Sequence, residues 1–480
     1  MSLSRKIALN TGLHALGKFG ASFIGIFVVA ILTRYLGIDG YGNYTTIFAY
    51  LFFFAILSDL GLYVVTVNEL NKSEYGEEKF FNNIFTLRFF SALVLMIAAS
   101  AIIWLFPYSL IIKLGVIVAS FSIFLNLLDQ LLVAFFQNKI NMKRVAVAEF
   151  IGKLALLVAT IFVVYLNGNI LGLIVAIILG FMVNFFINLC YLNKFIKLKF
   201  EFDKKIWRDI LKISWPVAIT SIFSLIYFKA DTLFLSILPA NPAYTVSNEA
   251  AVGIYGAPYK ILEVLITFPA IFMGLVSPLL SKAWQNNDRQ SFRASWQKAF
   301  DSLAIIIWPL IIGVLVLARP LIVLIAGVDF AVSAPVFRIL IFATAIIFVT
   351  HLTTYSIIAI NKQKNMIKYY LLAAILAVIL YIVLIPKYSY FAAAWVTTAV
   401  EFFMLISTIF ILKKYSGIKI NLSVFGKAML ASVIMGFVLN LIYGWNIILL
   451  IILGGAIYFG VLFLLNGVTK NILDTFKNIN

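Results

Sequence analysis

The sequence predicts an all-α protein that crosses a membrane many times. Of its 480 residues, 63% are hydrophobic and only 12% are charged, and the mean hydropathy is +1.06. Soluble domains carry about 25% charged residues. The hydrophobic residues form long runs, and a helix needs about 20 such residues to span the hydrocarbon core. Basic residues gather between alternate runs. Together these observations exclude a soluble globular class.

Fourteen hydrophobic segments are long enough to be membrane-spanning helices. The predicted spans are residues 11–36, 43–69, 81–106, 109–136, 145–166, 169–192, 213–238, 251–280, 299–318, 334–361, 366–385, 388–412, 424–443 and 446–466. The first is expected to be a retained span rather than a signal peptide. His14 and Lys18 interrupt it, and no cleavage site of small residues follows it.

The distribution of Lys and Arg predicts the orientation of the spans. With the N-terminus placed inside, 27 of the 37 Lys and Arg residues fall in inside segments and 4 in outside loops. Cytoplasmic loops carry such an excess of positive charge. Both termini are therefore expected to be cytoplasmic. The net charge of +18 then marks cytoplasmic loops, and no nucleic-acid partner is expected.

The longest basic loop, residues 193–212, separates two sets of six spans that share short patterns. Gln137–Met142 ends the fourth span much as Asn361–Met366 ends the tenth. An even-span unit keeps its orientation when repeated, so the repeats would be parallel. The predicted organisation is an N-terminal lobe (1–192), a basic cytoplasmic linker (193–212), a C-terminal lobe (213–412), and two further spans with a cytoplasmic tail (413–480).

Charged residues inside the predicted spans are the candidate functional residues. A charge at the bilayer centre costs about 2.5–3.5 kcal/mol on insertion scales, so it is expected to face a partner or a wet cavity. The candidate cations are Lys18, Arg34, Arg88, Lys153, Lys229, Lys260 and Arg338. The candidate acids, which could couple an ion or act as counter-ions, are Asp59, Asp129, Glu149, Asp231 and Glu263. Glu401 is a further isolated acid in a span.

Spacing along the helices predicts two local pairs. Glu149 and Lys153 are four residues apart, and Lys260 and Glu263 are three apart, so each pair shares a helix face. Such a pair could order the bundle or serve function, and the sequence leaves both open.

The other charges have no local partner in the sequence. Lys229 and Asp231 are two residues apart and point in different directions, so each is expected to meet another helix. Lys18, about two turns into its span, is expected to face the cavity. Arg88, near the cytoplasmic end of its span, is expected to extend to the interface.

Several kinds of catalytic and metal site are excluded. The chain has one cysteine, Cys190, and two histidines, so disulfides and Cys- or His-rich metal sites are not expected. It lacks the G-x-x-x-x-G-K-[ST] phosphate loop, the H-E-x-x-H helix and the G-x-S-x-G elbow. No resident cofactor is expected.

Several motifs resemble a known family of transporters. Residues Arg34–Gly37, Gly40–Gly42 and Asp59–Leu62 resemble the start of the polysaccharide-transport branch of the multidrug/oligosaccharidyl-lipid/polysaccharide (MOP) exporter superfamily, the Wzx-type O-antigen flippases. The second half resembles the same group at Pro216, Asp231, Gly253-Ile254-Tyr255, Ala257, Lys260, Pro269 and Pro278. The resemblance covers nearly the whole chain.

This resemblance implies a MOP/MATE-like fold of two six-helix lobes around a central cavity, plus two C-terminal helices. It implies a flippase, not an enzyme, that moves an undecaprenyl-diphosphate-linked oligosaccharide, such as an O-antigen repeat unit for lipopolysaccharide, to the outer leaflet by alternating access. H⁺ or Na⁺ would be the coupling ion, and the candidate cations would bind the diphosphate and sugars. The expected location is the bacterial cytoplasmic (inner) membrane. A monomer would work with membrane lipids, a polysaccharide polymerase and a chain-length regulator.

Two alternatives remain open. A cation-coupled multidrug exporter of the same superfamily would depend chiefly on carboxylates such as Asp59 and Asp231. A membrane glycosyltransferase or ligase acting on the same lipid carrier would need large outer loops with catalytic groups. The predicted outer loops are short, so this class ranks last.

Overall fold

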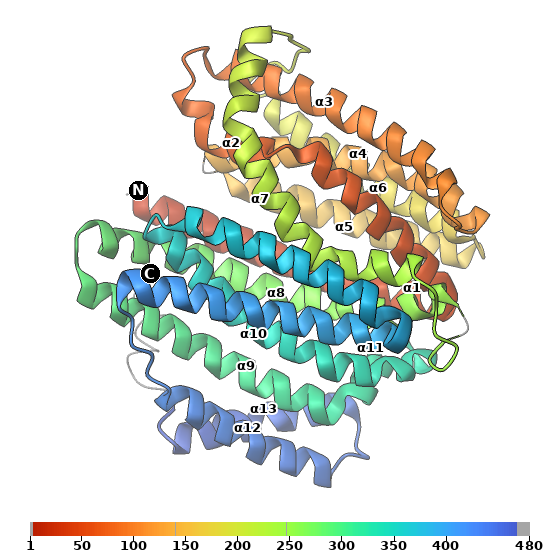
Figure 1. Ribbon diagram of the computed structural model, residues 1–480, viewed down its shortest axis with the longest axis vertical. Coiled ribbons are helices and arrows are strands. Elements are labelled where there is room, and N and C mark those ends of the chain that lie inside the picture. Colours follow the sequence, from red (N-terminus) through yellow and green to blue (C-terminus); the bar gives the residue numbers. More distant parts are fainter. Residues whose placement is uncertain (1–2, 140, 246, 468–480) are drawn as a thin grey trace. The chain divides into compact units, whose positions relative to one another are not determined.

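In the computed structural model, all regular secondary structure of the described residues, which are 3–139, 141–245 and 247–467, is helical (Figure 1). For residues 3–16, 18, 19, 216, 217, 220, 221 and 224–228 it describes the backbone alone. The α-helices are α1 (Leu3–Asp59), α2 (Leu62–Glu69), α3 (Glu77–Ile102), α4 (Leu110–Asn138), α5 (Met142–Tyr165), α6 (Ile170–Leu192), α7 (Lys204–Ile237), α8 (Asn248–Gln285), α9 (Arg289–Ala326), α10 (Ala334–Ala359), α11 (Ile367–Ser416), α12 (Ser423–Leu441) and α13 (Ile447–Leu464). Short 3₁₀ helices cover Leu70–Lys72, Ile103–Leu105, Val328–Ser333 and Gln363–Met366.

These helices confirm the predicted multi-span fold. Eleven helices in the described part of the chain are long and apolar enough to cross a membrane. α11 covers two predicted spans, α1 covers the first and together with α2 the second, and α7 covers a further one. Every one of the fourteen predicted spans therefore corresponds to helical structure. Helices suit this environment because they satisfy every backbone polar group within the segment, which hydrocarbon cannot do.

Residues with positive φ mark the joints between spans. Gly37 (φ 66°) divides α1 between the first two predicted spans, and Ser389 (φ 49°) divides α11 in the same way. A third break was not predicted. Leu60 and Gly61 both have positive φ and separate α1 from α2 inside the predicted second span. Glycine adopts this conformation without steric cost, whereas leucine and serine do not.

The described chain forms two compact units, Met1–Gly253 and Ile254–Asn480. The boundary follows helix packing, because α7 packs against α1, α2 and α3 of the first unit. The predicted lobes are divided by an internal repeat instead, and that division stays a prediction.

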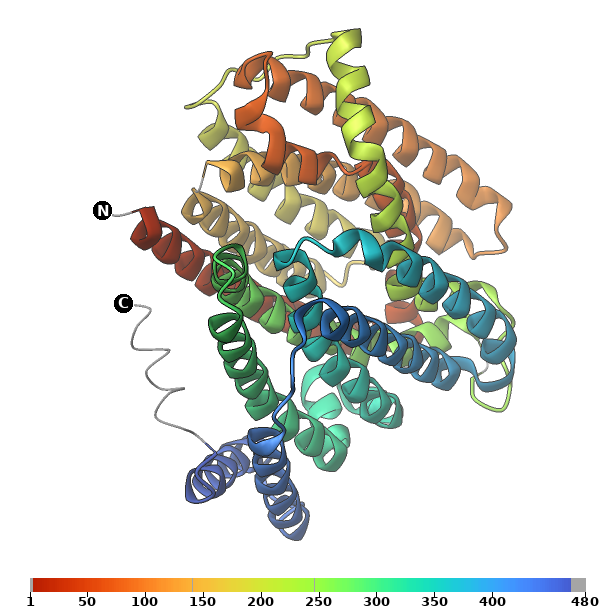
Figure 2. The ribbon, with the colours of Figure 1, turned by 60° about the vertical axis from the view of Figure 1, so that its left-hand side comes forward.

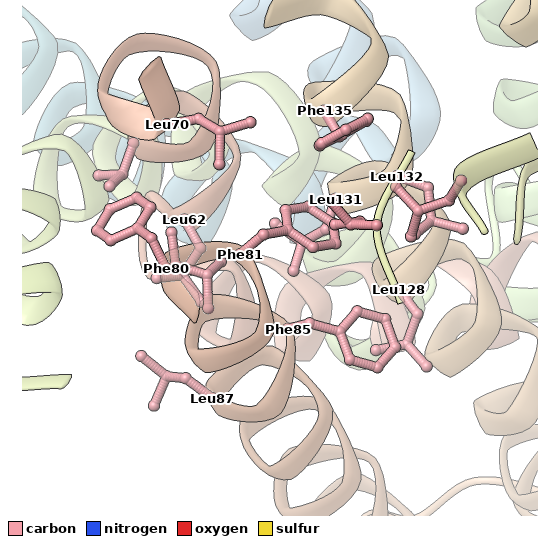
Figure 3. Packing of buried hydrophobic residues seen from close by; sticks show 14 of the residues in the cluster. Leu62, Leu70, Phe80, Phe81, Phe85, Leu87, Leu128, Leu131, Leu132 and Phe135 are labelled. Atoms are coloured by element: carbon pink, nitrogen blue, oxygen red, sulfur yellow. The ribbon is translucent and has the colours of Figure 1, made fainter. Parts of the chain in front are cut away.

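In the first unit, α1 is the central element. It packs against α3, α4, α5 and α7, while α6 packs against α4 and α5. Figures 1 and 2 show α3 running beside α4. One end of this unit holds a core of large apolar side chains, in which Phe81 of α3 meets Phe135 of α4 with ring centroids 5.3 Å apart (Figure 3). Ile196, Ile206 and Ile210 from the segment before and within α7 join this core.

Two glycines allow a close approach within the first unit. A Cβ at Gly42 of α1 would collide with the carbonyl oxygen of Glu249, and one at Gly253 would collide with that of Ile38. The hydroxyl of Ser247 also donates to Asp39 Oδ1 at 2.8 Å. The glycines therefore let the first turns of α8 lie directly on α1.

In the second unit, α10 packs between α9 and α11. The last two helices, α12 and α13, pack on each other and on α9, and the Tyr458 hydroxyl of α13 donates to the Ile305 carbonyl of α9 at 2.6 Å. These contacts attach the two extra predicted spans to the second unit.

Candidate functional site

The first unit holds a buried ion pair that joins three helices. Arg88 of α3 is fully buried, and its Nη1 lies 2.7 Å from Asp59 Oδ1 at the end of α1. The contact has the distance of an ion pair but not the angle of a hydrogen bond. Arg88 also donates to the carbonyls of Ser58 and Leu127, both at 3.1 Å, and to Gln130 Oε1 at 3.0 Å.

This geometry corrects one prediction. Arg88 does not extend to the interface, because its guanidinium is held between α1, α3 and α4. Asp59 is the counter-ion of Arg88, which is one of the two roles expected for it. The chain turns directly after Asp59, at Leu60 and Gly61, so the Ser58 carbonyl is near a helix end and uses the arginine as its donor.

A second polar cluster lies between α4 and α6. Asp129 is 5% exposed and accepts hydrogen bonds from Asn184 Nδ2 at 2.7 Å and Asn188 Nδ2 at 2.8 Å. The side-chain oxygen of Asn188 is buried and accepts no hydrogen bond from the described residues. The two asparagines were missed in the sequence because they are uncharged. Their spacing of four residues on one helix face is the signal that could have identified them.

Glu149 and Lys153 of α5 belong to the surroundings of this cluster. Glu149 lies close enough to interact electrostatically with both Lys153 and Asp129. Gly152, between the two charged residues, approaches α6 so closely that a Cβ there would lie 2.8 Å from the Cβ of Asn184. Close packing at Gly152 therefore places the charged face of α5 beside the asparagines of α6.

On α7, Lys229 and Asp231 have different surroundings. Asp231 is fully buried, and its Oδ1 accepts hydrogen bonds from the backbone N–H of Thr232 at 2.6 Å and from the Thr232 hydroxyl at 3.2 Å. Lys229 is partly buried, with its Nζ 5.6 Å from the ring centroid of Phe52 on α1. Lys229 therefore does meet another helix, through a cation–π contact.

The remaining two predicted cations of the first unit are Arg34 and Lys18. Arg34 is exposed and donates to the Ala30 carbonyl of its own helix at 3.1 Å. The side chain of Lys18 lies outside the described residues.

In the second unit, the structure confirms the pair on α8. Lys260 Nζ lies 2.7 Å from Glu263 Oε2, and the lysine side chain is about half exposed. Arg338 of α10 is exposed, and its Nε donates to the Leu315 carbonyl of α9 at 3.0 Å. Glu401 of α11 is 3% exposed and forms no hydrogen bond or ion pair with the described residues.

The predicted residues therefore lie in separate local groups. The first unit contains the Arg88–Asp59 pair, the Asp129 cluster with Glu149 and Lys153, and the two charges of α7. Carboxylate and amide side chains in such surroundings can bind a proton or a small cation, and lysines can bind an anion. Among the described residues, no group of three or more His, Cys, Asp or Glu side chains could hold a metal ion.

Comparison with known proteins identifies the sequence family and the fold. The model of the family described as polysaccharide biosynthesis protein matches residues 7–284, which is more than half of the chain. None of the curated proteins compared with the chain matches it.

Several solved membrane transporters share the fold. The inward closed conformation of the lipid II flippase MurJ is similar with a TM-score of 0.78 and 18% identity, covering 95% of this chain and 98% of that one. An outward-facing multidrug resistance MATE family transporter of the MOP superfamily is similar with a TM-score of 0.62 and 14% identity, covering 87% and 97%. The inward-facing conformation of such a transporter gives 0.59 and 14%, covering 85% and 93%. At these identities the likeness establishes a MurJ- and MATE-like fold.

Proposed function

Because the chain belongs to the polysaccharide biosynthesis protein family, we propose that it is a flippase for lipid-linked oligosaccharides. The substrate would be an undecaprenyl-diphosphate-linked repeat unit of a surface polysaccharide such as O-antigen. It would move from the cytoplasmic to the outer leaflet of the bacterial inner membrane, with both termini of the protein in the cytoplasm. The single observation that carries the proposal is the family match over residues 7–284.

The chemistry of the substrate suits the cations held in the spans. A diphosphate is strongly anionic and cannot cross hydrocarbon without compensating charge. Lys229 on α7 and Lys260 on α8 would supply that charge. The contact of Lys229 with the Phe52 ring, at 5.6 Å from its centroid, helps to position the ammonium group.

We propose that an ion gradient drives the transport. The Asp129 cluster supports a cation or proton site in the first unit, because a buried carboxylate there is surrounded by two amide groups and lies near Glu149. Asp231 and Glu263 would act as counter-ions for the lysines on their own helices. Lipids and a polysaccharide polymerase with its chain-length regulator would be the partners of a monomeric flippase.

A translocation assay in proteoliposomes tests the proposal. Purified protein is reconstituted with a fluorescent undecaprenyl-diphosphate oligosaccharide, and transfer between leaflets is followed with and without an imposed H⁺ or Na⁺ gradient. We expect transfer to need the protein and to increase with the gradient. Absence of transfer under every gradient, by protein of verified fold, would refute a flippase.

Matched lysine variants test the role of charge. Lys229→Ala and Lys260→Ala are expected to reduce transfer strongly, whereas Lys364→Ala, which removes an exposed lysine between α10 and α11, is expected to leave it unchanged. A multidrug exporter of the same superfamily is the second candidate, supported by the similar MATE structures. It would extrude cationic drugs and depend on Asp231 rather than on the lysines.

A further inference from the structure

The segment of residues 193–212, which joins α6 to the first turns of α7, has an unusual arrangement of charge. It carries seven basic residues, from Lys194 to Lys212, and three acidic ones. We call it the basic segment. A loop with this composition could simply be solvated, but its acids and its cations face different surroundings.

All three acids of the basic segment are bound to the first unit. Each accepts a bond from a side chain on α3 or on the loop before it. The pairs are Glu201 with Asn82 Nδ2 at 3.1 Å, Asp203 with Lys79 Nζ at 2.8 Å, and Asp209 with the Tyr75 hydroxyl at 2.7 Å. The negative charge of the segment is therefore directed at the protein.

All seven cations are exposed, and none forms an ion pair with the described residues. On α7, Lys204, Arg208 and Lys212 are four residues apart and form one stripe. Ile206 and Ile210 are fully buried on the other side of the helix. Lys204 and Arg208 therefore lie opposite the buried side of the helix, whereas Lys212 borders a pocket that is also lined by acidic residues, among them Glu69 and Glu74.

The backbone of the segment is held in place on α3. Alternate N–H groups donate to polar side chains of that helix. The bonds are Lys199 N to Asn82 Oδ1 at 3.3 Å, Glu201 N to Thr86 Oγ1 at 3.0 Å and Asp203 N to Asn83 Oδ1 at 2.8 Å. The cations are thus presented from an ordered support, which lowers the entropy lost when they bind a ligand.

Large aromatic side chains accompany the cations. Phe200 is 63% exposed, Phe202 is 70% exposed, and Trp215, one turn beyond the basic stripe of α7, is 58% exposed. Exposed aromatic rings next to lysines are typical of the membrane–water interface, where rings enter the headgroup layer and ammonium groups meet phosphates. The apolar part of α7 begins directly after Lys212.

We propose that the basic segment is a docking surface for anionic phospholipid headgroups of the leaflet next to it. Lys204, Arg208 and Lys212 bind the lipid phosphates, and Phe200, Phe202 and Trp215 lie among the upper acyl chains. The argument is charge complementarity. The segment directs its acids at the protein and presents seven exposed cations that form no ion pair with the described residues, although Lys194 and Lys205 lie over aromatic rings. It continues into the predicted span of α7. Bound lipid would hold the start of α7 at a fixed depth.

The test measures lipid preference close to Trp215 in the full-length protein. The protein is reconstituted in mixtures of phosphatidylglycerol and phosphatidylcholine in which one lipid or the other has brominated chains, and quenching of tryptophan fluorescence gives their relative affinity. The part of the signal that Trp215→Phe removes reports on the basic segment. We expect phosphatidylglycerol to be preferred at least about fivefold, which is the contribution of a single basic residue near an anionic surface. The preference should vanish in about 1 M salt, where the Debye length falls to about 3 Å.

A triple variant locates the interaction. In K204Q/R208Q/K212Q the preference is expected to fall below about twofold, and folding should be retained because these exposed groups form no ion pairs with described residues. The control K364Q/K413Q/K419Q removes the same charge from exposed positions of the second unit and is expected to keep the preference.

Three results would overturn the proposal. The wild-type protein could show no salt-sensitive preference for phosphatidylglycerol, and this measurement needs no variant. The control could lose the preference as fully as the triple variant. A small mole fraction of undecaprenyl diphosphate could displace phosphatidylglycerol from Trp215, which would assign the surface to the transported lipid instead.

Discussion

Replacement of Arg88 by methionine is expected to destabilise the protein severely. The change removes the ion-pair partner of Asp59, which lies 2.7 Å away. Only 21% of the Asp59 side chain is exposed. The same change also removes the donor for the Ser58 and Leu127 carbonyls and for Gln130. Removing one member of a buried ion pair costs about 3–5 kcal/mol, because the remaining charge stays desolvated. We expect Arg88→Met to lose that amount.

The double variant Asp59→Leu/Arg88→Met separates the charge from the rest of the interaction. It removes both charges, and a buried ion pair can often be replaced by apolar residues at little cost. Its loss should therefore be smaller than that of Arg88→Met alone, with a coupling energy of about 2 kcal/mol or more. Arg338→Met is the control, since this exposed arginine makes one hydrogen bond to a carbonyl and its loss should cost no more than about 1 kcal/mol.

Free energies of unfolding from SDS titration, followed by tryptophan fluorescence, provide the measurement. The reasoning is wrong if Arg88→Met lies within about 1 kcal/mol of the wild type. It is also wrong if the loss of the double variant equals the sum of the losses of Arg88→Met and of the single variant Asp59→Leu. Transport adds a second readout. If Arg88 only positions helices, transport per folded molecule should be nearly normal in Arg88→Lys. A loss of transport without a loss of stability would assign Arg88 to the substrate.

Three further predictions follow from other parts of the first unit. Gly42→Ala is expected to cost about 1–3 kcal/mol, because its methyl group would collide with a backbone carbonyl of α8. Gly25→Ala, which has open space around it, should be neutral or slightly stabilising in the same SDS titration, and equal losses in both would contradict the packing argument. The hydrogen bond from Lys79 holds the pKa of Asp203 below its ordinary value of 3.8. This stabilisation is present above pH 3.8 and is lost as the pH falls through the lowered value. Hydrogen exchange of residues 197–203 should rise there, and should rise already at neutral pH in Lys79→Gln. If hydrogen exchange of these residues rises neither at low pH nor in Lys79→Gln, the hydrogen bond from Lys79 does not hold the segment in place. Asp129→Asn should abolish the dependence of transport on an ion gradient, and replacing its two charge-assisted hydrogen bonds should cost about 1.5–3 kcal/mol. If gradient-driven transport survives in Asp129→Asn, the coupling site lies elsewhere.

The sequence predicts the helices well because hydrocarbon imposes a single backbone solution on every span. Long apolar runs therefore sufficed to locate all fourteen spans. The joints were harder to predict. Gly37 is a residue suited to positive φ, whereas Leu60 and Ser389 adopt positive φ against their preference, and local sequence carries no sign of it.

The site was predictable only where partners are close in the chain. Lys260 and Glu263 lie on one helix face, and their pairing follows from a spacing of three residues. Asp59 and Arg88 come from different helices, and no spacing rule relates them. Hydropathy identifies charges because they are rare in spans, but it does not draw attention to neutral amides such as Asn184 and Asn188.

The tertiary contacts also indicate which candidate cations have a structural role and which can bind the substrate. All three guanidinium nitrogens of Arg88 are already engaged, so binding a diphosphate there would mean breaking the junction of α1, α3 and α4. Lys229 differs, because its Nζ lies 5.6 Å from the Phe52 ring, a contact that a bound phosphate can replace without breaking a junction of three helices. At Arg88 the same exchange would cost a carboxylate contact and three hydrogen bonds. Transport should therefore respond to charge at Lys229, and stability should respond to charge at Arg88.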